Sequence, residues 1–431
     1  MTNPKIISRA EHNISRKDIS PQAVKVLYRL KDAGFAAYLV GGGVRDLLLG
    51  GHPKDFDVAT DAHPDEVNKL FRNCRLIGRR FRLAHIHFGR EIIEVATFRG
   101  HHDQAEGENE SRVENGMLVR DNVYGTLEED AWRRDFTINA LYYNIADFSV
   151  VDYTGGLQDL QTRTLRMIGD PQVRFQEDPV RMLRAIRFAA KLDVHLADEL
   201  SELIPRHAHL LEAISSARLF DEVLKLFLSG HAEKTFDLLH QYGLLQYLFG
   251  QTADSFRDEE TYAERFVRQA MRNTDIRIQA NKTINPAFLY AALLWPSLHW
   301  HTEQLKNAGM PAMPAMSQAS RNVLEQQISQ TAMPKRFRLP MKEIWLMQLR
   351  LPHRECRRSM RLLETPRFRA GYDFMLLRHQ SGEDDNLSEL CDWWTEIQTR
   401  DEEGRLAMCH EIKPLPGSKK RRRRKAKPNK T

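Results

Sequence analysis

The sequence predicts an α+β fold, with a small mixed sheet and helices at the N-terminus and only helices after it. Two observations predict this division. In the first third, short apolar runs with strand-like alternation lie between helical segments and end at glycines. From about Glu177 onward, apolar residues recur every three or four positions, which is typical of amphipathic helices separated by loops.

The elements of the first third can be placed in chain order. Helical periodicity precedes Gly34. After it we expect strands at residues 36–40, 55–60, 81–88, 91–98, 140–145 and 150–153, and helices at 44–49 and 63–72. Residues 100–116 hold five acids and three glycines and indicate a mobile surface loop. A stretch rich in Met, Pro and Ala, residues 308–320, is expected to be a loop between helices.

The chain is long enough for more than one compact unit, since it has 431 residues. Composition divides it into a polar leader (1–20), an α+β region (21–165), two helical regions (166–250 and 251–410) and a disordered basic tail (411–431).

Composition also excludes several classes of protein. No run approaches about 18 apolar residues, and the N-terminus has no apolar segment typical of a signal peptide. We therefore expect no membrane span and a cytoplasmic location. The cysteines Cys74, Cys356, Cys391 and Cys409 are scattered without a CxxC pair, which argues against a zinc knuckle and a disulfide framework.

Positive charge is clustered along the chain. The net charge is +6, but residues 413–431 carry ten Lys or Arg and no acid, so the remainder sums to −4. Residues 335–378 hold twelve Lys or Arg against four acids, with aromatic side chains between them. Such clusters indicate a polyanionic partner.

The strongest chemical signal begins with a glycine turn at residues 41–43, between an expected strand and an expected helix. Glycines there let backbone N–H groups approach a phosphate closely, and Arg45 adds positive charge. The spacing fits neither a Walker loop nor a dinucleotide fingerprint, so the turn alone is a weak signal.

Two aspartates follow the turn. Asp55 and Asp57 lie two residues apart on an expected strand, so they share a face while Phe56 and Val58 turn into the core. Close carboxylates repel unless a cation lies between them, and oxygen ligands suit Mg²⁺ bound to substrate phosphates. The alternative is an edge strand with two solvated aspartates; the nearby glycine turn favours the metal site.

Two candidates exist for a third acidic group. Glu94 lies between Ile93 and Val95 on an expected strand, where it either joins the aspartate pair or forms a cross-strand salt bridge. Asp135 lies in a charged stretch before an apolar segment, and its alternative is an acid at a helix N-terminus, stabilised by the dipole.

Residues 177–190 predict a capped helix with a basic stripe. Asp178 is expected to be the N-cap, with Pro179 at the first helical position. Arg181, Arg184 and Arg187 recur every three residues beside an apolar stripe. These residues fit either an ordinary amphipathic helix or a nucleotide site in which Asp178 and Arg181 face a base edge and the other arginines face the triphosphate.

Taken in order, residues 42–50, 55–57, 133–140, 152–156 and 177–181 closely resemble motifs of the nucleotidyltransferase family that contains CCA-adding tRNA enzymes and bacterial poly(A) polymerases. The resemblance spans roughly residues 38–190. It implies a nucleotidyltransferase head, a helical neck at 166–250 and a helical body at 251–410, with the helical regions and tail binding RNA.

The resemblance also implies roles for single residues. Catalysis would rest on Asp55, Asp57 and Asp135, with Mg²⁺ (Mn²⁺ as an alternative) on Asp55 and Asp57. Base selection would rest on Asp178 and Arg181. The nucleotide-binding set would be Gly42, Gly43, Arg45, Asp46, Arg134, Asn139, Asp178, Arg181 and Arg184.

Three features resemble the poly(A) polymerase branch: the leader before the head, the stretch at 76–85, and the arginine-rich end. They imply template-independent addition of AMP from ATP to RNA 3′ ends, with RNA-decay machinery as a partner and the basic tail on RNA. A CCA-adding tRNA enzyme is the first alternative, and a non-catalytic RNA-binding regulator is the second.

Overall fold

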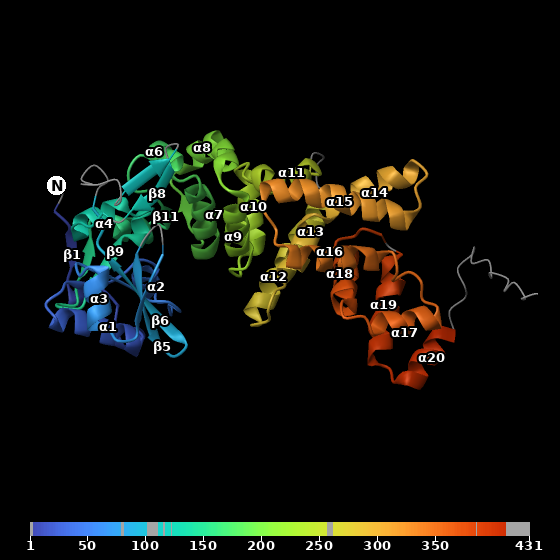
Figure 1. Cartoon of the computed structure of the whole chain (residues 1–431), viewed down its shortest axis with the longest axis horizontal. Coiled ribbons are helices and arrows are strands. Elements are labelled where there is room, and N and C mark those ends of the chain that lie inside the picture. The colour runs from blue at the N-terminus through green and yellow to red at the C-terminus, as the bar shows by residue number, and fades with distance from the viewer. Residues whose placement is uncertain are drawn as a thin grey trace, which may run out of the picture. The chain divides into compact units, whose positions relative to one another are not determined.

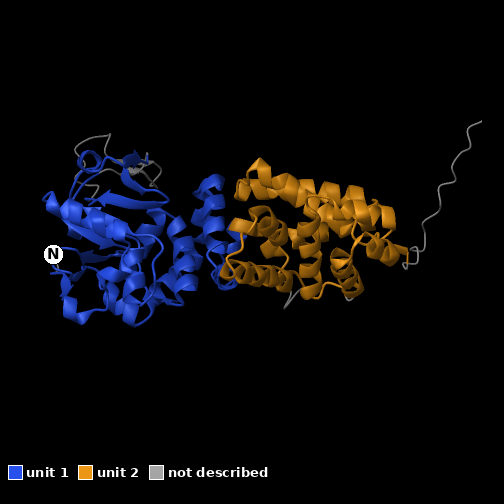
Figure 2. Ribbon diagram, turned by 90° about the horizontal axis from the view of Figure 1, so that it is seen from below, with its two compact units in different colours: residues 1–247 blue, residues 248–431 orange. Residues whose placement is uncertain are grey.

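A mixed sheet forms the core of the N-terminal part of the chain. In this computed structural model the described residues are 3–78, 82–100, 111–114, 117–121, 123–256, 262–384 and 386–410. The chain divides into two compact units, residues 1–247 and 248–431 (Figure 2). The division lies close to the expected boundary at residue 250.

The main sheet of the first unit has eight strands within the described residues, in the order β1-β10-β9-β2-β3-β6-β5-β4. Neighbours are antiparallel except β3 and β6, which are parallel, so the sheet is mixed as predicted. Its strands are β1 (Lys5–Ile7), β2 (Ala37–Val40), β3 (Asp57–Thr60), β4 (Cys74–Ile77), β5 (Leu83–Phe88), β6 (Glu91–Thr97), β9 (Leu141–Asn144) and β10 (Val150–Asp152).

Two of these strands lie where no strand was predicted. β1 comes from the leader and pairs with β10, so the leader is the edge of the head sheet. β4 pairs with β5 at the other edge. Both are short and partly exposed, with little apolar alternation to reveal them.

A hairpin of β7 (Ser111–Glu114) and β8 (Met117–Asp121) corrects part of the loop expected at 100–116. The many acidic residues and glycines in this stretch hide the strand pattern. The two strands pair only with each other among the described residues. Residues 101–110, 115 and 116 lie outside the described part. A further two-stranded sheet pairs β11 (Thr164–Leu165) with β12 (His195–Leu196).

Helix α1 (Pro21–Asp32) shows how sequence places a helix on the sheet. The Ser20 hydroxyl accepts from the backbone N–H of Ala23, and Pro21 occupies the first turn, where no intrahelical donor is needed. Ala23, Val26, Leu27 and Leu30 are fully buried at helical spacing, and α1 packs against β2, β3 and β6 (Figure 1).

The remaining helices of the first unit lie between the strands of the sheet and after them in the chain (Figure 1). Their bounds are α2 (Gly42–Leu48), α3 (Pro64–Leu70), α4 (Leu127–Arg133), α5 (Gly156–Gln161), α6 (Pro171–Glu177), α7 (Val180–Leu192), α8 (Asp198–His207), α9 (Ser216–Phe227) and α10 (Ala232–Gln241). Short 3-10 helices lie at Arg9–Glu11, Arg16–Asp18, Thr137–Asn139 and Ala208–Ala213.

Asp152 holds the turn that supports the 3-10 helix Thr137–Asn139. Its carboxylate accepts backbone N–H bonds from residues 154–157, at 2.9–3.1 Å. A Cβ on Gly156 would lie 2.2 Å from the Thr137 carbonyl oxygen, so only glycine allows this approach. The 152–156 motif therefore has a structural role: it fixes the backbone that carries Asn139.

The second unit is helical throughout its described residues, as predicted. Trp295, Trp345 and Trp394 are at most 1% exposed and centre its packing. After α11 (Leu245–Asp254), its helices are α12 (Tyr262–Gln279), α13 (Pro286–Leu293), α14 (Trp295–Asn307), α15 (Ala312–Gln330), α16 (Lys335–Gln348), α17 (Cys356–Leu363), α18 (Phe368–Gln380), α19 (Leu387–Thr399) and α20 (Glu402–His410).

The loop expected at 308–320 is wrong for most of its length, because α15 begins at Ala312. Pro311 is the N-cap and Pro314 lies in the first turn, where a missing N–H costs no helical bond. The Ala and Met residues favour helix. No helix of the described residues is both long and apolar enough to cross a membrane.

Candidate functional site

The predicted turn from strand to helix is present at the end of β2. Gly41 has φ +71°, a left-handed conformation that glycine adopts without strain, and it caps α2. A Cβ on Gly43 would be in ordinary contact, 3.6 Å from the Asp55 carbonyl oxygen. The turn thus brings the start of α2 against the backbone that carries the aspartate pair.

Asp55 and Asp57 are both exposed, whereas Phe56 and Val58 are buried at 6% and 0% exposure. Asp57 is the first residue of β3 and Asp55 comes just before the strand. The alternation of exposed and buried residues is as predicted, although the regular strand begins at Asp57, two residues later than expected.

Glu94 lies on the same side of the sheet as Asp57. The two residues are partners in the parallel register of β3 and β6. The pKa of Asp57 is raised to about 6, first by partial removal from water and then by the charges of Glu94 and Asp55, against which Arg134 acts. The carboxylates therefore repel one another, and a cation would relieve that repulsion.

The donor set fits an ion shared with a substrate. It consists of carboxylate oxygens, the ligands that Mg²⁺ prefers. Within the described residues, no three His, Cys, Asp or Glu side chains converge to enclose a metal ion.

A chain of polar contacts runs from α2 to α7. Arg45 is 2% exposed; its Nε donates to Asp46 Oδ1 at 2.8 Å and its Nη1 to Asn139 Oδ1 at 2.6 Å. Asn139 Nδ2 in turn donates to Asp135 Oδ1 at 3.3 Å, and Arg184 Nε to Asp135 Oδ2 at 2.8 Å. Four of the predicted nucleotide-binding residues are thus brought together with the predicted catalytic Asp135.

Both oxygens of Asp135 accept bonds from the protein, since the Phe136 backbone N–H also donates to Oδ1 at 2.9 Å. Burial alone would raise the pKa of Asp135, but the Arg184 charge and these hydrogen bonds hold it below its usual value. The carboxylate is therefore ionised and committed to a link between α7 and the residue 135–139 segment.

Arg134 is fixed beside the glycine turn. Its Nη2 donates to Asp130 Oδ2 at 3.0 Å and its Nε to Tyr142 Oη at 2.9 Å. A Cβ on Gly41 would lie 3.5 Å from Arg134 Nη1. Its positive charge acts on Asp57 and partly opposes the rise in the pKa of that carboxyl group.

Helix α7 carries the predicted basic stripe. Its apolar residues Val180, Leu183, Ile186 and Ala190 are buried as expected. The guanidinium groups of Arg45, Arg184 and Arg187 lie 5.4, 5.6 and 5.1 Å from the centre of the Phe188 ring. Sequence reasoning missed Phe188, although an aromatic residue inside a basic stripe was a visible signal.

The two predicted base-selecting residues are held by different partners. Arg181 Nη1 donates to Glu177 Oε2 at 2.7 Å. Arg218 of α9 donates to Asp178 Oδ2 at 2.7 Å. Arg218 was missed because nothing in the sequence relates it to Asp178, 40 positions away.

The predicted cap is off by one residue. Helix α6 ends at Glu177 with Asp178 as its C-cap, and α7 begins at Val180 with Pro179 as its N-cap. Asp178 Oδ1 nevertheless accepts from the Val180 backbone N–H at 3.3 Å. The carboxylate still faces the start of α7, so the helix start was displaced but its acidic flank was correct.

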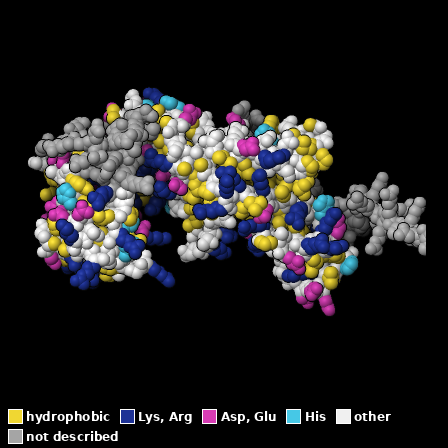
Figure 3. All heavy atoms as spheres, in the orientation of Figure 1, with side chains coloured by type: hydrophobic (Ala, Val, Ile, Leu, Met, Phe, Trp, Pro, Cys, Tyr) yellow, Lys and Arg dark blue, Asp and Glu magenta, His cyan; other side chains and the backbone are white. Residues whose placement is uncertain are grey.

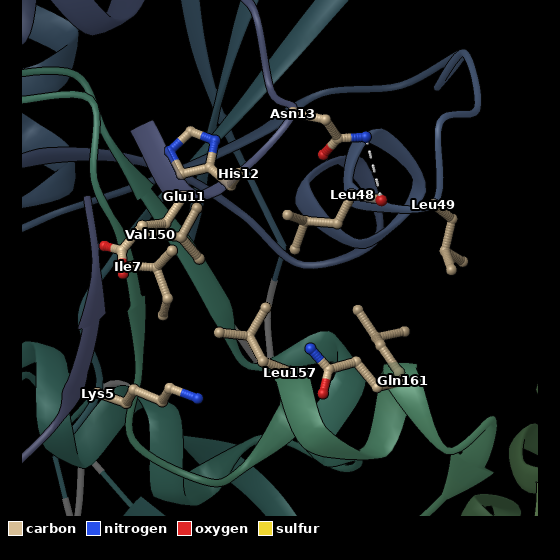
Figure 4. A pocket seen from close by; sticks show the side chains of 11 residues that line it. Lys5, Ile7, Glu11, His12, Asn13, Leu48, Leu49, Val150, Leu157 and Gln161 are labelled. Carbon is tan, nitrogen blue, oxygen red and sulfur yellow. Dashed lines mark hydrogen bonds between the residues drawn. The ribbon is translucent and has the colours of Figure 1, made fainter. Parts of the chain in front are cut away.

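A separate cavity of about 480 Å³ lies in the first unit. Figure 4 shows Lys5, His12 and Asn13 of the leader region facing Leu157 and Gln161 of α5 across it. None of the predicted site residues lines this cavity.

Three family models match the chain. Residues 37–166 match the model described as the poly A polymerase head domain. Residues 193–256 match a probable RNA and SrmB-binding site of polymerase A, and residues 308–428 match the polymerase A arginine-rich C-terminus.

Relatives extend this likeness. Poly(A) polymerase I of Salmonella typhimurium is 50% identical over 426 residues, which cover 98% of this chain and 92% of the relative. The CCA-adding enzyme of Lactobacillus helveticus is 38% identical over 224 residues, 51% of this chain and 53% of that protein. The solved CCA-adding enzyme of Thermotoga maritima in complex with tRNA shares the fold, with a TM-score of 0.62 at 18% identity, covering 96% of this chain and 92% of that one.

The Asp135–Arg184 link predicts a pH-dependent loss of stability. Asp135→Asn should lower the stability of the first unit by about 2 kcal/mol at pH 7, because a partly buried guanidinium loses its partner. Since the pKa of Asp135 is lowered by folding, its contribution is complete above the unfolded value of about 3.9 and is lost as the pH falls through the lower folded value. Urea unfolding of both proteins at pH 7 and at about pH 3 measures the difference; one that grows at the acidic pH contradicts this account.

Proposed function

The chain belongs to the bacterial poly(A) polymerase family and is a polynucleotide adenylyltransferase; from this premise we propose how its residues add AMP from ATP to RNA 3′ ends without a template. The observation that carries the proposal is the exposed carboxylate pair, Asp55 and Asp57, beside the glycine turn at the start of α2. Carboxylates, a phosphate-approaching backbone and a guanidinium cluster are the groups that nucleotidyl transfer needs.

In the proposed reaction, the RNA 3′-oxygen forms a bond to the α-phosphorus of ATP, the bond between that phosphorus and the bridging oxygen breaks, and pyrophosphate leaves. Asp55 and Asp57, with Glu94 beside them, would hold Mg²⁺ (Mn²⁺ as the alternative), which when bound supplies positive charge to the phosphate oxygens. Family membership supports use of a divalent ion.

The triphosphate is proposed to lie against the turn and the guanidinium groups. Backbone N–H groups of Gly42 and Gly43 open the helix, and Arg45, Arg184 and Arg187 surround the Phe188 ring. Burial and the nearby Arg184 lower the pKa of Arg187, which indicates positive charge that an anion would balance. Asp46, Asn139 and Asp135 position Arg45 and Arg184, so we propose that Asp135 acts through them.

The base is proposed to meet the residues at the α6–α7 junction. An amino group on the base can donate to Asp178, and a ring nitrogen can accept from Arg181. Arg134 would keep its charge near Asp57 and the transferred phosphate, since it is anchored on Asp130 and Tyr142.

RNA is proposed to bind the neck, body and tail. Lys and Arg side chains spread over the face of the second unit in Figure 3, and residues 413–431 add ten more. The match of residues 193–256 to a probable RNA and SrmB-binding site supports a protein partner there, and we propose that this partner belongs to the RNA-decay machinery of the cytoplasm.

CCA addition is the less favoured activity, because the CCA-adding relative covers 51% of the chain and the poly(A) polymerase covers 98%. A non-catalytic regulator is disfavoured by the retained, exposed Asp55 and Asp57.

Nucleotide choice is the first test. Purified protein given a generic RNA and each NTP in turn should extend it with long A tracts from ATP and add at least tenfold less of the other nucleotides. Gel electrophoresis of labelled RNA measures the products. Addition that stops at CCA on tRNA would replace this proposal with the alternative.

The carboxylate pair is the second test. Asp55→Ala and Asp57→Ala should each reduce AMP incorporation by at least about a thousandfold while RNA binding stays within twofold, because the substitutions remove ion ligands and no RNA contact. Asp61→Ala, at the residue that directly follows β3, serves as the control. Near-normal activity of either variant would remove the metal site from the mechanism.

The basic tail is the third test. Every Lys and Arg of residues 413–431 is replaced by Gln. The slope of log K for RNA binding against log salt concentration should then become less steep, by at most about 7. Fluorescence anisotropy at several salt concentrations measures the slope. An unchanged slope would mean that the tail does not contact RNA.

A further inference from the structure

A row of side chains crosses the sheet beside the proposed metal site. His85 of β5 is the register partner of Glu94 in β6, and Glu94 is the register partner of Asp57 in β3. Residues directly opposite in register project to the same face of a sheet. The row therefore runs from His85 through Glu94 to Asp57.

Burial of the neighbouring residues supports this assignment of faces. Ile93 and Val95 are 1% and 2% exposed, and Ala84 and Ile86 are 1% and 0% exposed. The other face of both strands is thus in the core, and the charged and imidazole side chains alternate with it.

His85 is the side chain that contacts Glu94. Its Nε2 lies 3.2 Å from Glu94 Oε1, with the imidazole 16% exposed and the Glu94 side chain 48% exposed. The Nε2 atom is buried, and the present angle does not form a hydrogen bond. A rotation of the Glu94 carboxylate would be needed to complete that bond.

We propose that His85 is a positioning residue for the metal site, whose Nε2 holds the Glu94 carboxylate beside Asp57. The inference rests on the proposed function, because it gives Glu94 a place in the ion-binding group. Groups that orient metal-bound ligands from behind change metal affinity or activity by about 10- to 100-fold when removed.

The contact would do little for stability, since an ion pair or hydrogen bond to a half-exposed carboxylate is weakened by water. A role confined to folding therefore predicts almost no change at the metal site. Positioning predicts a change in ion binding with unfolding nearly unaffected, so the two roles have different readouts.

The chain offers a matched control in His87. It lies two residues further on β5, is half-buried, and its ring centre is 6.3 Å from that of His85. Its register partner is Ile92, which has no carboxylate to hold. Replacing His87 changes the same strand and the same face without touching Glu94.

The experiment compares His85→Phe with His87→Phe in the full-length protein. Binding of Mn²⁺ in the presence of a non-hydrolysable ATP analogue is measured by electron paramagnetic resonance, and the Mg²⁺ concentration for half-maximal AMP incorporation is measured in parallel. We expect His85→Phe to raise both constants about tenfold and His87→Phe to change them less than twofold. Equal effects of the two variants, or no effect of His85→Phe, overturn the inference.

Two polar variants cover a failure of His85→Phe to fold. The side-chain nitrogen of Gln can reach the position of His85 Nε2, whereas the Asn side chain is too short for its nitrogen to do so. His85→Gln should stay within threefold of the parent and His85→Asn should resemble the loss expected for Phe; the reverse order contradicts the proposal.

If Asp57→Ala also remains active, the proposed function has failed; if Asp57→Ala is inactive while His85 variants bind Mn²⁺ normally, only this inference has failed.

Discussion

Electrostatic repulsion on one face of the sheet is the constraint on which the site depends. Asp57 starts β3 between the glycine turn and Glu94, and its raised pKa shows that its charge is disfavoured without a counterion. A cation that binds between these carboxylates would relieve their repulsion, which favours its binding. The core on the opposite face, with Val58 and Val95 buried, fixes the strands that carry Asp57 and Glu94 side by side.

The positive half of the site is built differently. Arg45 is buried in α2, and Arg184 belongs to α7. Hydrogen bonds through Asn139 and Asp135 connect the two arginines. This chain fixes guanidinium groups that would otherwise repel one another around Phe188. The cost of holding like charges together is offset by Asp135, whose ionised form is favoured by its partners.

The carboxylate side of the candidate site was largely predictable from sequence, because its pattern is local. Alternation alone predicts that Asp55 and Asp57 are exposed and that Phe56 and Val58 are buried, as they are. The edge strands β1 and β4 were not predictable, since short exposed strands carry little pattern and depend on a partner distant in sequence. The start of α15 is hard to predict because proline, which favours loops, is also tolerated in the first turn of a helix.

The base side of the site was predictable only in its residue types. Asp178 and Arg181 stand on the expected helix, but their partners are decided by tertiary contacts: Arg218 comes from α9, while Glu177 precedes the helix. The orientation of Asp178 and Arg181 in this chain therefore depends on contacts that the neighbouring helices supply. On the proposed function, the reaction would depend on the strand and turn, whereas the choice of nucleotide would depend on how the following helices pack.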